Sequence, residues 1–393
     1  MGPFISIDCK LKKFAHSNQL QPLTQALTLS DWMANAGAQL IWYGAHDKSG
    51  LTECDPLAAV RGVGDQDLMI LTDALAVIVS ESPSPIDQCY ITSPKIAWFD
   101  YAAQELRHQR GFALLLRALG RLANAIGLSH HCVVGNFPIS TVVWTEGELN
   151  LIPQVCRTLE LSRPDRFLFV RNIRPELHAQ LCEELVGLGF YALPARVVYE
   201  FDLRQEPEKV PSQLKRDMKD ASKLTLHCQV VEEITREESE QLQALYYSIY
   251  IEKHGAFNAQ YTPKFLRDMI NGGAMRCLML HDSAGVCVAF ALLHQVDVTL
   301  TVPALGYDVH HRVAGLYRAL FVQVYKYTLA HQLLLNYSSG AGEFKRKRGG
   351  VPRMEFTMVK APQSYWQWKS RILKLLQHLS FELGVEELIA LGA

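Results

Sequence analysis

A glycine-rich segment with four consecutive cations is the strongest candidate for chemistry in this sequence. It reads Ser338-Ser-Gly340-Ala-Gly342-Glu-Phe-Lys345-Arg346-Lys-Arg-Gly-Gly350. We expect a mobile loop rich in hydrogen-bond donors, of a kind that suits phosphate groups, a nucleotide or an RNA end. A run of charge is more often a solvated surface. This run, however, follows an expected strand over 333–337, and sites in α/β proteins commonly open where strands end.

A second candidate precedes an expected helix. The segment Val309-His-His-Arg312-Val-Ala-Gly315-Leu-Tyr lies between a strand and an amphipathic helix over 314–330. An Arg-x-x-Gly turn at this place can aim backbone N–H groups at a phosphate, helped by the helix dipole. Glycine allows a ligand to approach the backbone closely. An ordinary helix N-terminus is the alternative reading.

The C-terminal half has the elements needed to position both segments. A capping box at Thr235–Glu238 starts a helix. Apolar runs separated by turn residues then predict strands over 276–281, 286–293 and 296–305, and the helix over 314–330 leads to the strand over 333–337. This order predicts a mixed α/β layer.

The N-terminal half predicts a similar mixture with weaker signals. We expect strands over 40–43, 68–70, 74–79, 131–134, 166–170 and 196–203, and helices over 99–126 and 175–186. A faint internal repeat appears at an offset of 201 residues, where Arg117-Ala-Leu matches Arg318-Ala-Leu and Cys132-Val-Val matches Leu333-Leu-Leu. The repeat predicts two related domains that meet near 193–197, with coincidence as the alternative.

The order Arg312-x-x-Gly315, helix, strand and Gly-x-Gly-x-Phe-Lys345 resembles the FemABX and BioF2-like branch of the GNAT acyltransferase superfamily. The segment 212–223, with Arg216 and Lys219, looks like that family's basic helix. Arg171-Asn-Ile with Gly189-Phe is similar to the segment that closes its first domain. The resemblance covers about residues 165–360.

The resemblance implies an α/β (α+β) fold of two GNAT-like mixed-sheet domains with a C-terminal helix. The expected divisions are a divergent N-terminal domain over 1–194, a C-terminal acyltransferase domain over 195–360, and a helical extension over 361–393.

The resemblance also implies N-acyl or aminoacyl transfer to an amine, in natural-product or cell-wall precursor biosynthesis. The co-substrate would be an acyl-CoA, an acyl carrier protein or an aminoacyl-tRNA, with no tightly bound cofactor and no metal. The acceptor would be a small-molecule amine. Lys345 is the implied catalytic residue, as oxyanion stabiliser or phosphate clamp. The implied donor-binding residues are Arg312, Gly315, Gly340, Gly342, Arg346, Arg216 and Lys219. A catalytically inert protein that keeps the fold to bind a nucleotide or a protein partner is the alternative.

Composition limits the remaining classes. Of 393 residues 49% are hydrophobic and 20% charged, and 39 basic residues against 40 acidic ones give a net charge of −1. This charge argues against a DNA-binding surface over the whole chain. Nine cysteines without a Cys-x-x-Cys pair argue against a zinc ribbon or a disulfide scaffold and favour a cytoplasmic protein. We expect no stable membrane insertion, because no apolar run reaches about 18 residues.

The C-terminal extension predicts a basic amphipathic helix. Trp366, Trp368, Ile372, Leu375 and Leu376 share it with several cations. Such a helix either touches a membrane surface or docks on the body of the protein, and docking is the more common outcome.

Overall fold

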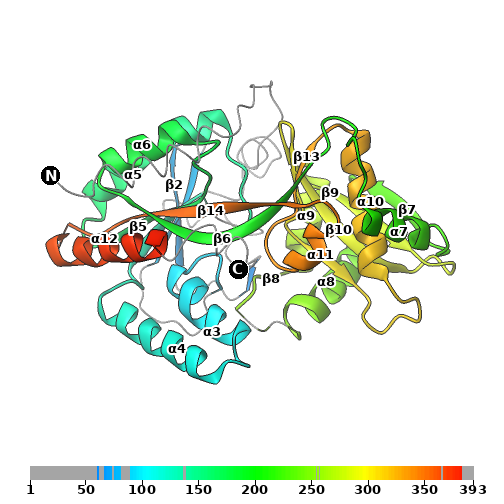
Figure 1. Ribbon diagram of the computed structural model, residues 1–393, viewed down its shortest axis with the longest axis horizontal. Coiled ribbons are helices and arrows are strands. Elements are labelled where there is room, and N and C mark those ends of the chain that lie inside the picture. Colours follow the sequence, from blue (N-terminus) through cyan, green and yellow to red (C-terminus); the bar gives the residue numbers. More distant parts are fainter. Residues whose placement is uncertain are drawn as a thin grey trace.

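A single mixed sheet runs through both halves of the protein and confirms the predicted α/β class. The structure is a computed structural model that describes residues 60–61, 66–72, 75–80, 89–135, 139–253, 255, 257–363 and 366–382. The strand expected over 40–43 lies outside these residues. Figure 1 shows the sheet crossing the molecule, with helices on both sides of it.

The strands are β1 Val60–Arg61, β2 Gln66–Thr72, β3 Leu75–Ser80, β4 His131–Val134, β5 Phe167–Ile173, β6 Tyr191–Asp202, β7 His227–Val231, β8 Gln260–Tyr261, β9 Arg276–His281, β10 Cys287–Val296, β11 Thr299–Thr301, β12 Leu305–Tyr307, β13 Leu334–Asn336 and β14 Val351–Lys360. The helices are a π-helical turn Ile96–Asp100, α3 Tyr101–Glu105, α4 Arg110–Ala125, α5 Glu146–Ser162, α6 Ala179–Gly187, α7 Ser212–Ala221, α8 Arg236–Tyr250, α9 Pro263–Asn271, α10 Leu316–Ala330, α11 Gly342–Arg346 and α12 Trp366–Glu382. The predicted capping box Thr235–Glu238 starts α8.

The two halves are joined by long strands that pass between them. The strand order is β2-β3-β4-β5-β14-β6-β13-β11-β10-β9-β7, with β12 beside β10. Strand β14 therefore lies between β5 and β6, and β6 lies between β14 and β13. Both strands run across the middle of the molecule (Figure 1). The boundary predicted at 194/195 falls inside β6, whose residues pair with both β14 and β13.

Each half contains a strand–helix–strand crossover with parallel strands. In the first, α5 connects β4 to β5; in the second, α10 leads from β11 and β12 to β13, which pairs with β11. Strand β11 starts 168 residues after β4, at 299 against 131, and α10 starts 170 residues after α5, at 316 against 146. The predicted offset of 201 gives a different alignment, in which α4 and β4 correspond to α10 and β13.

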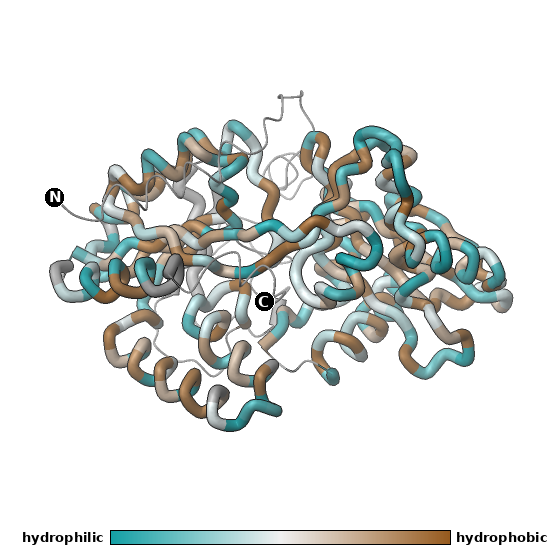
Figure 2. The backbone as a smooth tube through the Cα atoms, viewed as in Figure 1, coloured by the Kyte–Doolittle hydropathy of each residue, from teal (hydrophilic) through white to brown (hydrophobic). Residues whose placement is uncertain are grey.

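Alternating side chains of the strands build two cores on opposite faces of the first half-sheet. Leu168 and Val170 of β5 face α5 and α6, whereas Phe167 and Phe169 face α4 and α12. This division follows from the two-residue repeat of a strand. In the second half, α7 and α10 pack on one face and α8 and α9 on the other. Figure 2 shows hydrophobic and hydrophilic residues alternating along α4 and α5.

No helix within the described ranges is both long enough and apolar enough to cross a bilayer.

Candidate functional site

The chain turns sharply where β13 ends. Ser338, Gly340 and Ala341 have φ angles of 58°, 78° and 49°, in the left-handed region. Glycine adopts this conformation freely, but serine and alanine do so at a cost. The turn directs three successive carbonyl groups, those of residues 337–339, toward helix α11, which follows at once.

Lys345 of α11 donates hydrogen bonds to these three carbonyls. Its Nζ donates to the carbonyl oxygens of Tyr337 at 2.7 Å, Ser338 at 3.2 Å and Ser339 at 2.9 Å. The residue is 2% exposed, and no carboxylate among the described residues forms an ion pair with it. Burial, and secondarily the nearby Arg196 cation, lowers the pKa of Lys345 to about 7. The side chain is thus a buried amine that titrates near neutral pH.

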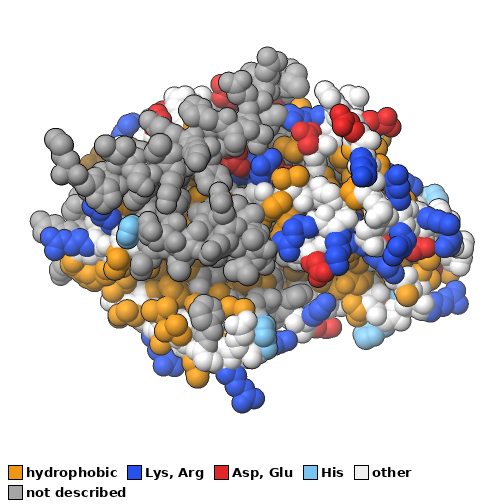
Figure 3. Space-filling model, viewed as in Figure 1, with side chains coloured by type: hydrophobic (Ala, Val, Ile, Leu, Met, Phe, Trp, Pro, Cys, Tyr) orange, Lys and Arg blue, Asp and Glu red, His pale blue; other side chains and the backbone are white. Residues whose placement is uncertain are grey.

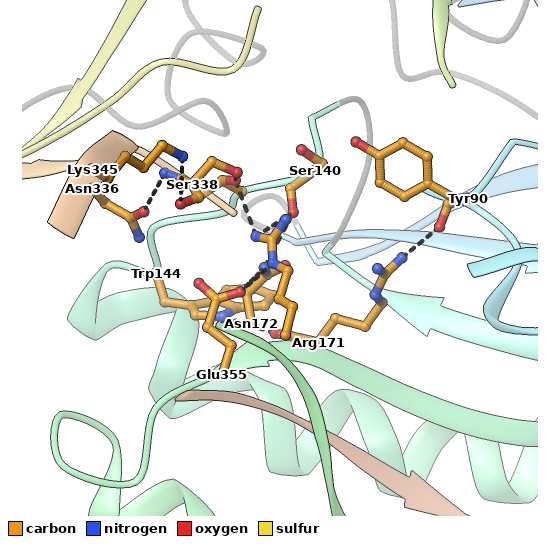
Figure 4. A network of polar contacts seen from close by, with 11 residues as sticks. Tyr90, Ser140, Trp144, Arg171, Asn172, Asn336, Ser338, Lys345 and Glu355 are labelled. Carbon is orange, nitrogen blue, oxygen red and sulfur yellow. Dashed lines mark hydrogen bonds and ion pairs between the residues drawn. The ribbon is translucent and has the colours of Figure 1, made fainter. Parts of the chain in front are cut away.

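A carboxylate and a guanidinium lie on the two strands that cross between the halves. Nε of Arg196, on β6, donates to Glu355, on β14, at 2.7 Å. The Asn172 amide donates to the same carboxylate oxygen at 2.8 Å and to the Ser140 carbonyl at 3.1 Å. Arg196 also donates to the Ser140 carbonyl and to Thr141 Oγ1, both at 3.0 Å. Figure 4 shows this network beside the Lys345 loop.

A second guanidinium lies next to the network. Arg171, in β5, donates to the carbonyls of Tyr90 at 2.9 Å and Ile91 at 2.8 Å. Its own carbonyl accepts a hydrogen bond from the Trp144 indole at 3.3 Å. Burial, followed by the charge of Arg196, lowers the pKa of Arg171 to about 10. The two arginines therefore lie within electrostatic reach of each other.

One hydroxyl pair joins the two parts. Thr141 Oγ1 lies 2.9 Å from Ser338 Oγ, so the segment before α5 contacts the loop after β13. We call the whole group the junction site; its members are Ser140, Thr141, Arg171, Asn172, Arg196, Ser338, Lys345 and Glu355. It contains three basic side chains and one carboxylate. A buried excess of positive charge favours the binding of an anion.

The cationic run is not the mobile loop that we predicted. Residues 342–346 form α11, and each cation has a partner. Arg346 donates to the Tyr199 hydroxyl at 2.7 Å, Lys347 pairs with Glu343 on the surface at 2.5 Å, and Arg348 pairs with buried Asp217 at 2.5 Å. Only the Lys347 pair is local; Tyr199 lies on β6 and Asp217 on α7, so the sequence pattern of glycines and cations did not indicate these partners.

The predicted segment 309–317 packs against the predicted segment 338–350. Gly315 has a φ of 91° and starts α10, as its glycine predicted, and Arg312 is exposed nearby. The Tyr317 and Phe344 rings are 4.8 Å apart, so α10 and α11 pack directly on each other. The expected residues of the two segments therefore lie on adjoining elements.

The remaining predicted residues have different surroundings. Gly342 is needed where it stands, because a Cβ atom there would lie 2.3 Å from the Tyr199 hydroxyl. Arg216 and Lys219 are exposed on α7 and belong to no contact of the junction site. They remain predicted electrostatic contacts to a donor.

Arg171, Arg196 and Glu355 were not among the predicted site residues. All three stand in strands whose other members are mostly apolar and buried. A charged residue inside a buried strand needs a partner, and this signal was available in the sequence. The sequence did not show that these three residues lie together. Their proximity depends on the pairing of β6 with β14 between the two halves.

No cluster of three metal-ligating side chains occurs among the residues that the structure describes.

Comparison with known proteins gives fold relatives only. No protein-family model matches the chain, and no protein with curated annotation matches it either. Among solved structures, L-PGS from Bacillus licheniformis is similar at 12% identity, covering 79% of this chain and 88% of that chain, with a TM-score of 0.50.

Two further structures cover most of the chain at TM-scores of 0.47. The C-terminal domain of a putative lysylphosphatidylglycerol synthetase from Agrobacterium fabrum is 13% identical and covers 76% of this chain and 84% of that chain. FemX is 9% identical and covers 89% of this chain and 95% of that chain. The described chain therefore shares its overall fold with L-PGS from Bacillus licheniformis, and its mixed sheet with flanking helices agrees with the predicted α/β class.

Proposed function

We propose that the protein is an acyltransferase that moves an acyl or aminoacyl group from a thioester carrier or an aminoacyl-tRNA to an amine. The observation that carries this proposal is the buried excess of positive charge at the junction site, where Lys345 has no carboxylate partner among the described residues. The predicted resemblance to FemABX-like and BioF2-like acyltransferases supports the same reaction.

The reaction needs a cation where the acyl carbonyl is attacked. The acceptor nitrogen forms a C–N bond, the C–S or C–O bond to the carrier breaks, and the carrier leaves as a thiol or hydroxyl after taking up a proton. Between these events the carbonyl oxygen becomes an oxyanion. A fixed ammonium group stabilises that charge. Lys345 fits this role because an oxyanion can replace its longest hydrogen bond, the 3.2 Å contact to Ser338.

We assign donor binding to the elements around α11. The start of α10 at Gly315 and the turn at Gly340 and Gly342 offer backbone N–H groups, and Arg312 and Arg346 offer guanidinium groups near them. Arg216 and Lys219 would contribute at longer range. Phosphates of coenzyme A, of a phosphopantetheine arm or of a tRNA end are the groups that such donors bind. A cytoplasmic location is part of the same proposal, because these donors are found there.

The test is a deacylation assay with purified protein, a mixture of aminoacyl-tRNAs and a mixture of acyl-CoAs, each with a panel of amines. The proposal expects amine-dependent loss of one donor class, weaker at higher ionic strength because phosphate contacts are screened. Deacylation that needs no amine would indicate hydrolysis and contradict the proposal.

A catalytically inert binding protein is the second candidate, favoured by the fact that all three Lys345 N–H groups already have acceptors. The same assay separates the two. Saturable donor binding without turnover, measured by calorimetry, would support the inert protein.

A further inference from the structure

Helix α4 presents its large apolar side chains to solvent. Leu115, Leu119 and Leu122 follow at helical spacing and form a stripe with Leu114. On the side that faces the body of the protein the fully buried residues are small, namely Ala113, Gly120 and Ala123, with Leu116 half-buried beside them. A Cβ atom at Gly120 would lie 2.9 Å from Phe99, so close packing uses the small residues. The leucine stripe therefore does not take part in packing the helix onto the body of the protein.

Helix α12 likewise buries polar residues against the sheet and exposes large apolar ones. Its sheet-facing side buries Ser370, Leu373 and Gln377, and the Ser370 hydroxyl has no hydrogen-bond partner there. Trp368, Leu375 and Leu376 are exposed instead. The helix docks on the body, as the sequence favoured, but through a partly polar side. The exposed apolar side chains of the two helices are between 40% and 63% exposed.

The two helices cover the same face of the sheet. Ala123 of α4 and Leu373 of α12 share one core cluster with Phe167 and Phe169 of β5. The apolar residues that point away from that core therefore lie on one side of the molecule. We call them the leucine face; its members are Leu114, Leu115, Leu119, Leu122, Trp368, Leu375 and Leu376. Figure 3 shows hydrophobic side chains gathered where Figure 1 places α4, with basic side chains beside them.

The basic residues beside the leucine face indicate the kind of surface that it binds. Arg110, Arg117 and Arg121 share one flank of α4, and α12 adds Lys369, Arg371 and Lys374. The sequence has no Asp or Glu from 106 to 145, and α12 has one acidic residue, at its last position. Leucine and tryptophan bordered by cations is the pattern of helices that lie in the headgroup region of a bilayer.

We propose that the leucine face docks on the surface of an anionic membrane. The apolar side chains enter the headgroup boundary while the cations contact lipid phosphates. A second copy of the chain fits less well, because a two-fold interface would oppose identical sets of cations. The inference is independent of the reaction proposed above, since none of these residues belongs to the junction site.

The test is flotation of the intact protein with vesicles of phosphatidylcholine alone and of phosphatidylcholine mixed with phosphatidylglycerol. We expect binding to the anionic vesicles that weakens as salt is raised. Each cation near such a surface contributes about fivefold in partitioning, so R117Q/R121Q lowers binding about 25-fold. L115Q/L122Q abolishes it. L161Q/L177Q is the matched control: Leu161 and Leu177 are also exposed, on or beside α5 and α6.

Equal melting temperatures of the variants show that folding is intact. Absence of binding to anionic vesicles at low salt overturns the proposal, as does equal binding by L115Q/L122Q and its control. A dimer in sedimentation velocity that L115Q/L122Q dissociates, without vesicle binding by the parent protein, assigns the face to a second copy and also overturns it.

Discussion

Nε of Arg348 lies 2.5 Å from the carboxylate of Asp217, and both side chains are almost fully buried. The pair connects α7 to the segment that follows α11. Arg348 also donates to the Phe344 carbonyl at 2.8 Å and lies over the Phe344 ring. The basic run thus ends in a structural anchor, which holds the middle of α7 to the segment after α11 across more than one hundred residues of chain.

Removing one partner of this anchor leaves a buried charge uncompensated. Asp217→Asn is expected to lower the free energy of unfolding by about 3–5 kcal/mol, measured by urea denaturation. Lys347→Ala breaks only the exposed pair with Glu343 and is expected to change stability little. Equal losses in the two variants would show that the buried pair is not the anchor described above.

Lys345→Ala is expected to lower both activity and stability. Transfer should fall by about 10²–10³ if the ammonium stabilises the oxyanion. The unfolding free energy should fall by about 1–3 kcal/mol, because three loop carbonyls lose their donor. A lysine in an open cleft would contribute little to stability, whereas Lys345 is buried with three acceptors.

Two further variants separate these effects. Lys345→Met fills similar space without a donor, and should match the alanine variant in activity while packing better. Lys347→Ala should retain nearly full activity in single-turnover transfer. Full activity in Lys345→Ala would remove the proposed catalytic residue, whatever its stability.

Stability should depend on pH through Lys345. Burial lowers its pKa from 10.5 to about 7 in the folded state, so the unfolded chain binds one more proton than the folded chain between these values. Folding stability therefore rises with pH from about 7 to about 10.5, and the cost of the buried charge is fully present below 7. The measurement is the difference in unfolding free energy between the parent protein and Lys345→Met at each pH. A difference that does not change with pH would contradict the burial of a titrating lysine.

Activity should respond to pH in the opposite direction. If the charged ammonium is the active form, the ratio of parent to Lys345→Ala transfer rates falls as pH rises above about 7. Taking the ratio cancels protonation of the acceptor amine, which is common to both proteins. A ratio that is flat from pH 6 to 9 would argue against a charged Lys345 in the reaction.

Gly342→Ala tests the contact between α11 and β6. The added Cβ would lie 2.3 Å from the Tyr199 hydroxyl, so the helix must shift at a cost of about 1–3 kcal/mol. Adding Tyr199→Phe removes the obstructing oxygen and should recover part of that cost. Gly187→Ala is the control, since no atom lies within 4 Å of its added Cβ and its backbone is helical. Equal effects of the two glycine substitutions would contradict the close contact.

Local sequence patterns were enough to predict the α/β class of fold and to single out Lys345 as a candidate. Helical spacing after Thr235 and apolar runs between turn residues depend on contacts within a few residues, so they can be read locally. Gly315 was placed correctly for the same reason, because a helix start needs only its own backbone angles. The order of glycines before Lys345 likewise marked the turn after β13.

The surroundings of Lys345 depend instead on contacts between residues far apart in the sequence. Arg196 and Glu355 are 159 residues apart in sequence. They meet because β6 and β14 pair as neighbouring antiparallel strands between the halves. The same long-range packing buries Lys345, pairs Arg348 with Asp217 and turns an expected mobile loop into a helix. It also decides that α4 buries alanine and glycine and exposes leucine. Hydrophobic spacing identifies an apolar side of a helix, but which side meets the sheet depends on the shape of the neighbouring surface.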